Sequence, residues 1–148
     1  MVETIAQVLA ALCASLFAGS ALYSGLVESR TALGLAAEDP ATYFVRGFCS
    51  SGTFQAPLVL VGTVAALVAA TFTGSSLWIA GAALMALVIV VTAVLIFPLN
   101  ARLLHPAKHP NTRDQRGLVV RWYRLHAVRG LLALAASSLY LFALVQAR

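Results

Sequence analysis

Four long apolar segments constrain this chain more than any other feature of its sequence. They cover residues 5–27, 56–73, 77–97 and about 125–145. A helix that crosses roughly 30 Å of bilayer hydrocarbon needs about 20 apolar residues, which these segments approach or reach. Within lipid the backbone must satisfy its own hydrogen bonds, so each segment is expected to be helical. We therefore predict an all-α fold, an integral membrane four-helix bundle that forms a single domain over residues 1–148.

The composition supports a membrane environment. The chain is 61% hydrophobic and only 10% charged, with a mean hydropathy of +0.90, whereas soluble domains carry about 25% charged residues. The net charge of +5 and the pI of 9.9 would also suit nucleic acid. The basic residues, however, cluster between the apolar segments. Membrane lipids with anionic headgroups are therefore the expected partners, and nucleic acid is not.

The basic residues also predict an orientation. Four spans place both termini and the 73–76 turn on one side of the membrane, and the two longer loops on the other. Against a single basic residue, Arg148, the long-loop side holds Arg30, Arg46, Arg102, Lys108, Arg113, Arg116, Arg121 and Arg124. The positive-inside rule then predicts a multi-pass protein of the cell membrane, with cytoplasmic long loops and both termini outside.

The segments between the spans carry their own expectations. Residues 28–55 are expected to form a loop, and Pro98-Leu99-Asn100 to end the third span. Trp78 is expected to anchor that span at the membrane interface. A capping box begins at Thr112, so the last helix is predicted from Arg113 to about Val145. At 1.5 Å per residue it would be roughly 50 Å long and would lie partly outside the membrane.

Small residues form a stripe on the first span. Ala11, Ser15 and Gly19 recur at four-residue spacing, which places them on one helix face. Such a stripe lets another helix approach closely. The neighbour is either another span or a second copy of the chain, so a homo-oligomer is possible.

Polar residues at the start of the last span are the first candidates for function. Trp122, His126 and Arg129 follow i, i+4, i+7 spacing and share one helix face. Because desolvating a charged group within the bilayer costs several kcal/mol, that face is expected to point into the protein.

The predicted topology brings further polar residues to the same depth. Glu28 ends the first span, Gln55 begins the second and Asn100 follows the third, so with His126 and Arg129 they are expected to converge on one pocket at the mouth of the bundle. Each also has a structural interpretation. Glu28 can be solvated, Arg129 can snorkel to headgroups, Asn100 can cap a helix, and His126 can be a hydrogen-bonded structural residue.

Two kinds of chemistry suit this set of residues. In the first, His126 is a general base, Glu28 orients it or acts as a second base, and Arg129 with Asn100 stabilises an oxyanion or enolate. In the second, Glu28 and His126 bind a metal, although one His and one carboxylate fall short of the usual three protein ligands. We expect no cofactor and no metal site. His105 and His109 lie beside prolines and are expected to be turn residues.

Several short motifs resemble those of the anthrone oxygenase-like family of small four-helix membrane proteins. They are Leu16-Phe17-Ala18-Gly19-Ser20-Ala21-Leu22-Tyr23, Val27-Glu28, Arg46-Gly47-Phe48, Gln55-Ala56-Pro57, Phe97-Pro98-Leu99-Asn100 and Trp122 to Arg129. The resemblance covers nearly the whole chain. It differs at one motif, where the family usually has Glu-His-Pro and this chain has Glu28-Ser29-Arg30. The resemblance therefore does not imply, for this chain, any role that requires a second histidine at the pocket.

The resemblance implies oxidation of an anthrone to an anthraquinone without a cofactor. His126, Glu28, Arg129 and Asn100 are then the expected catalytic residues, and the substrate-binding residues are expected to be Trp122, Gln55, Tyr23 and Arg46. The substrate would be a lipophilic, anthrone- or quinone-like aromatic molecule that partitions into the bilayer. The alternative is a non-enzymatic membrane protein that binds lipid or a small molecule, or serves as an accessory subunit.

Overall fold

The computed structural model describes the backbone of residues 1–30, 34, 40–104 and 112–146, and the side chains of residues 1–30, 34, 52–104 and 116–146. Within these ranges the chain is helical and has no strand. The elements in order are α1 (Val2–Tyr23), η1 (Ser24–Glu28), α3 (Pro40–Thr73), α4 (Ser76–Val91), η2 (Thr92–Ile96), α5 (Phe97–Leu103) and α6 (Thr112–Gln146). The two η elements are π-helical turns continuous with their neighbouring helices.

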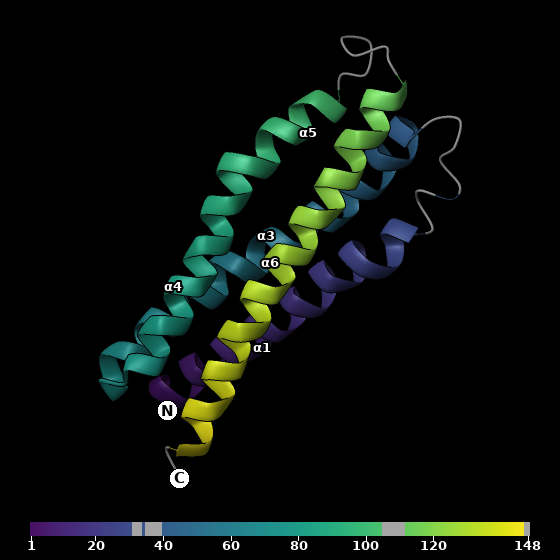
Figure 1. Ribbon diagram of the computed structural model, residues 1–148. Coiled ribbons are helices and arrows are strands. Elements are labelled where there is room, and N and C mark those ends of the chain that lie inside the picture. Colours follow the sequence, from purple (N-terminus) through teal and green to yellow (C-terminus); the bar gives the residue numbers. More distant parts are fainter. Residues whose placement is uncertain (31–33, 35–39, 105–111, 147–148) are drawn as a thin grey trace.

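The described part of the chain contains four helical segments that are long and apolar enough to cross a membrane, as predicted. Their bounds are Val2–Glu28, Gly52–Thr73, Ser76–Leu103 and Arg116–Gln146. The protein is therefore an all-α, multi-pass membrane protein. Both termini lie at the same end of the bundle as the α3–α4 turn (Figure 1). Which side of the membrane that end faces stays a prediction.

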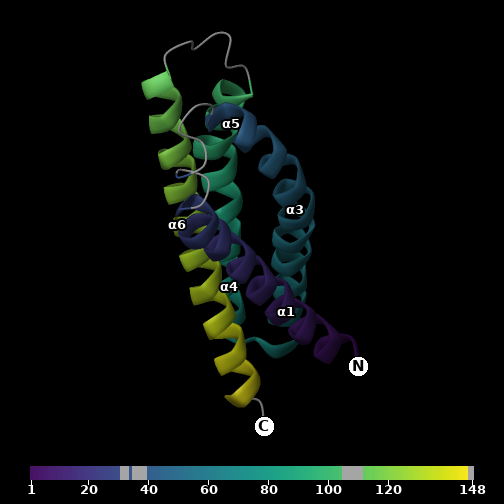
Figure 2. The ribbon, with the colours of Figure 1, turned by 90° about the vertical axis from the view of Figure 1, so that its right-hand side faces the viewer.

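The prediction that residues 28–55 form a loop is wrong, because α3 begins at Pro40 and extends the second span by several turns. Proline is well tolerated in the first turn of a helix, where its missing N–H has no intrahelical partner. The apolar pattern that marked residues 56–73 identified only the part of the helix that suits a membrane. Figure 2 shows that α3 bends along its length. Pro57, inside the helix, removes one of its hydrogen bonds.

The third span does not end at Pro98. It continues through the π-helical turn η2 into α5 and ends at Leu103. Pro98 lies in the first turn of α5, where the preceding π-helical turn has already interrupted the regular hydrogen-bond ladder. Asn100 is consequently a helical residue, and its side chain is 5% exposed. The last helix, α6, begins at Thr112 and ends at Gln146, close to its predicted bounds.

Alanine makes the contact between α1 and α6 close. Ala10, Ala14, Ala133 and Ala136 are fully buried in the main core. Small side chains let helix backbones approach, which is how helices associate where lipid supplies no hydrophobic driving force. The small residues of α1 that pack in the core are Ala10, Ala14 and Ala18, one position before the predicted stripe. Of that stripe, Ala11 is buried and the Ser15 hydroxyl lies 2.7 Å from the Ser137 hydroxyl. Gly19 is exposed and would have open space around a Cβ atom.

The prediction that Trp78 is an interfacial anchor is wrong. Its side chain is 2% exposed, and its ring stacks on Tyr140 with centroids 5.0 Å apart. The turn before it forms as expected. Gly74 adopts a φ of +65°, which glycine tolerates without strain, and the Ser75 hydroxyl accepts a hydrogen bond from the backbone N–H of Leu77.

Candidate functional site

A partly open cavity of about 260 Å³ lies among all four spans, in the half of the bundle nearer the long connections. This cavity, the polar pocket, has an apolar lining into which a small number of polar side chains project. They are Gln55, Thr92, Asn100, Trp122, His126 and Arg129. Apolar cavities with a few convergent polar groups are typical of small-molecule sites, although this one lies just below their usual size of roughly 300–1,000 Å³.

Trp122 forms one wall of the polar pocket. Its indole Nε1 donates a hydrogen bond of 2.8 Å to Oδ1 of Asn100, which ties α6 to α5. Its ring lies against the imidazole of His126, with centroids 3.6 Å apart and planes tilted by 32°. Both side chains are almost fully buried. Asn100 therefore holds Trp122 in place, and Trp122 in turn restricts the orientation of His126.

The hydrogen bond of His126 defines which ring nitrogen can act as a base. Nδ1 lies 3.1 Å from the backbone carbonyl oxygen of Trp122, one helical turn earlier. A carbonyl oxygen only accepts, so Nδ1 carries the proton in this contact. In the neutral imidazole Nε2 then keeps its lone pair. Nε2 has no hydrogen-bond partner among the described residues, so its lone pair is available to a molecule in the pocket.

Arg129 places a positive charge one turn further along α6. Nη1 donates to the Thr92 hydroxyl at 3.0 Å and Nη2 to Oε1 of Gln55 at 2.7 Å, while the guanidinium carbon lies 5.4 Å from the ring centroid of Phe17. Nε is buried without a hydrogen-bond partner. Within the described ranges Arg129 has no ion pair with a carboxylate, so its charge is compensated only by neutral dipoles and a π face.

Thr92 is a pocket residue that the sequence analysis missed. It begins the π-helical turn η2, and its hydroxyl donates to the carbonyl oxygen of Val88 at 2.7 Å while it accepts from Arg129. A threonine inside an apolar run gives no signal of this role by itself. π-Helical turns occur often at functional sites because they shift a side chain out of the regular helical register.

The structure thus brings Gln55, Asn100, Trp122, His126 and Arg129 together, and it leaves two other predicted site residues outside the pocket. Glu28 is half-buried at the end of η1 and does not line the pocket, and Tyr23 is 60% exposed and also lies outside it. The remaining residue, Arg46, lies on α3, where side chains are outside the described residues.

The metal-binding alternative required Glu28 and His126 to share a site. Glu28 does not line the pocket that contains His126. In the ranges whose side chains are described, no group of three or more His, Cys, Asp or Glu side chains is placed to hold a metal ion. His105 and His109 lie outside the described residues.

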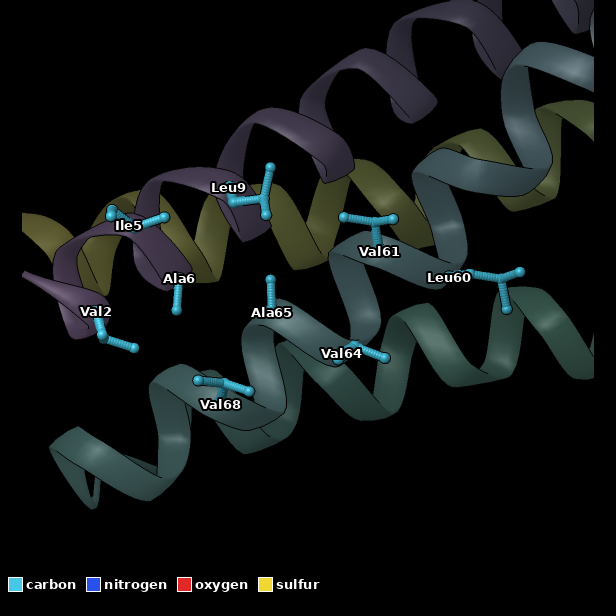
Figure 3. A pocket seen from close by; sticks show the side chains of 9 residues that line it. All are labelled: Val2, Ile5, Ala6, Leu9, Leu60, Val61, Val64, Ala65 and Val68. Atoms are coloured by element: carbon cyan, nitrogen blue, oxygen red, sulfur yellow. The ribbon is translucent and has the colours of Figure 1, made fainter.

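A second, larger cavity lies between the N-terminal half of α1 and the C-terminal half of α3 (Figure 3). Its volume is about 540 Å³, and every side chain that lines it is an alanine, valine, leucine or isoleucine. Such a lining offers no hydrogen bond and no charge for catalysis or for orienting a ligand. The polar pocket is therefore the candidate functional site, although it is the smaller cavity.

The fold and the polar pocket define a class of protein. It is a small four-span membrane protein in which a buried histidine and a buried arginine line a largely apolar pocket. A family sequence model described as anthrone oxygenase matches residues 44–139. Because that match covers more than half of the chain, the protein belongs to the anthrone oxygenase family. The matched range includes all six polar residues of the pocket. No curated protein and no solved structure matches the chain.

Proposed function

We propose that this protein is a membrane oxygenase that oxidises an anthrone- or quinone-like aromatic substrate with molecular oxygen, without a cofactor. One observation carries the proposal: His126, whose Nε2 keeps its lone pair, and Arg129, whose charge has no carboxylate partner among the described residues, both line one largely apolar pocket. The first can remove a proton, and the second can stabilise the anion that remains. Family membership supports the same chemistry.

The first step is removal of a proton from carbon. An anthrone has an acidic methylene group conjugated through its rings to a carbonyl group. His126 Nε2 takes one methylene proton, and the electron pair of the C–H bond moves through the ring system onto the carbonyl oxygen. The resulting enolate is anionic, and the guanidinium of Arg129 balances its charge. The Gln55 and Thr92 contacts hold that guanidinium in place before the charge develops, which avoids reorganisation during the step.

The second step is the reaction of the electron-rich enolate with oxygen. The enolate transfers electrons to O₂ and forms a C–O bond at the former methylene carbon. Loss of the second hydrogen and cleavage of the O–O bond then give a new carbonyl group. Overall, the methylene carbon is oxidised to a ketone, one oxygen atom of O₂ enters the product, and the other is reduced to water with the two hydrogens removed from that carbon. The reaction therefore needs no reductant, and no oxidant other than O₂.

The lining of the polar pocket suits a planar aromatic substrate. Its non-polar wall includes the Trp122 and His126 rings and the aliphatic side chains of Val59, Ile89 and Ile96. Aromatic rings favour offset stacking on one another. A flat, apolar molecule with one polar oxygen would therefore find both a surface to stack on and one site for charge. In this proposal Asn100 positions Trp122, and Glu28 and Tyr23 have no contact with the substrate.

The experiment uses purified protein in liposomes, with anthrone as the substrate and spontaneous oxidation in protein-free liposomes subtracted. We expect quinone formation by absorbance, with one O₂ consumed per quinone. The variant His126→Ala should lower turnover by about 10²–10⁴-fold, whereas the control Ser138→Ala, at an exposed position of the same helix, should retain it. Unchanged turnover in His126→Ala would refute the base role. Anthrone binding without turnover in the unaltered protein would favour the non-enzymatic alternative.

A further inference from the structure

We propose that the polar pocket opens sideways into the hydrocarbon of the membrane, between α3 and the η2–α5 segment, and that its ligand enters from the bilayer through this opening. That the entering molecule is the oxidised substrate rests on the proposed function. The existence of the opening does not.

Two rows of residues both line the pocket and are exposed on the outside of the bundle. On α3 they are Gly52, Ala56 and Leu60, and on the opposite wall Ala93 and Phe97. Within each row the residues are four positions apart, so each row follows one helix face. Leu60 is 55% exposed and Phe97 is 61% exposed. A residue that faces both the cavity and the exterior marks the rim of an opening.

The rim lies in the membrane. Its two rows belong to the candidate spans Gly52–Thr73 and Ser76–Leu103. The exposed surface of a spanning helix faces lipid acyl chains, so an opening between two such helices leads to hydrocarbon. The five rim residues are glycine, alanine, leucine and phenylalanine, which lipid solvates without cost. The buried polar side chains, among them Gln55, His126 and Arg129, lie behind them.

Both walls of the opening depart from regular helix at this level. Pro57 follows Ala56, a residue of the α3 row, and removes a backbone hydrogen bond at this level of the helix. The opposite row runs through the π-helical turn η2. In addition, three of the five rim residues are glycine or alanine, and the space around Gly52 is open to at least 4 Å from a Cβ atom. Small side chains at these three positions leave space between the two walls.

The test uses Trp122 as a reporter, because the chain has only two tryptophans. In a Trp78→Phe background, Trp122 is the sole tryptophan and lies in the pocket wall. The protein is reconstituted in phosphatidylcholine liposomes whose acyl chains carry bromine, a quencher confined to hydrocarbon. We expect strong quenching of Trp122 by these lipids and little by acrylamide added to the water.

Two variants then close the opening from opposite walls. Ala56→Phe and Ala93→Phe should each remove most of the quenching by brominated lipid. Ala83→Phe, at an exposed position of α4 that does not line the pocket, is the matched control and should leave it unchanged. Thermal unfolding of each variant checks that the fold is retained, and two independent rim positions keep the test valid if one variant does not fold.

Quenching by acrylamide in place of brominated lipid would overturn the proposal, because it would show that the pocket opens to water. Lipid quenching that neither rim variant reduces would also overturn it. The readout needs no turnover, so it separates the two proposals. Quenching that depends on the rim, without anthrone oxidation, would support the opening and refute the function. Oxidation without such quenching would do the reverse.

Discussion

Replacing Arg129 by methionine should separate the stability of this protein from its activity. The substitution removes two charge-assisted hydrogen bonds, to Thr92 and Gln55, each worth about 1.5–3 kcal/mol. It also removes a buried guanidinium that no described carboxylate neutralises, and such a group carries a desolvation penalty of several kcal/mol. These contributions oppose one another and have similar size. We therefore expect the free energy of unfolding to change by no more than about 2 kcal/mol.

The expected effect on activity is much larger. The enolate oxygen loses the cation that balances its charge, and removing one such donor from an active site typically lowers turnover by about 10²–10³-fold. Arg129→Lys keeps the positive charge but not the planar fork that contacts both Thr92 and Gln55. Its kcat/KM for anthrone should lie between those of Arg129→Met and the unaltered protein.

The assay combines thermal unfolding in detergent, followed by helical circular dichroism, with anthrone oxidation in liposomes. The reasoning would be refuted by an Arg129→Met protein that unfolds far more easily but retains its turnover per folded molecule. In that case the arginine would serve the fold and not the reaction. Equal activity of Arg129→Met and the unaltered protein would remove the electrostatic part of the mechanism.

Three further predictions follow from individual contacts. Gly81→Ala should destabilise the fold by about 1–3 kcal/mol, because the new Cβ atom would clash with the ring of Tyr140. An unchanged midpoint of thermal unfolding would contradict this contact. Tyr140→Phe should be neutral or stabilise the protein by about 1 kcal/mol, since the tyrosine hydroxyl is buried without a hydrogen-bond partner; clear destabilisation would mean that the hydroxyl has one. Asn100→Leu should shift the fluorescence emission of Trp122 and raise the KM for anthrone, because it removes the acceptor of the 2.8 Å hydrogen bond from Nε1; a shift in emission without any kinetic effect would show that Trp122 does not contact the substrate.

Much of the fold was predictable because hydropathy is a property of the local sequence. Each apolar segment must be helical in lipid wherever its neighbours lie, so the four spans and the long last helix followed directly. The ends of the helices were less predictable. α3 begins at Pro40, well before its apolar stretch, and the third span continues past Pro98 after a π-helical turn. The hydropathy pattern predicts neither feature. The burial of Trp78 was not predictable either, because it depends on stacking against Tyr140, which is distant in sequence.

For the candidate site, too, the sequence predicted the features that depend on local spacing and not those that depend on packing between helices. The sequence by itself determined that Trp122, His126 and Arg129 share a face of the last helix, because helical spacing is local, and the cost of charge in lipid turned that face inward. Only the tertiary structure decided which residues of the other spans meet it. Rotation of each helix about its axis is set by packing, which brought Gln55, Asn100 and the unforeseen Thr92 to the pocket and left Glu28 and Tyr23 outside it.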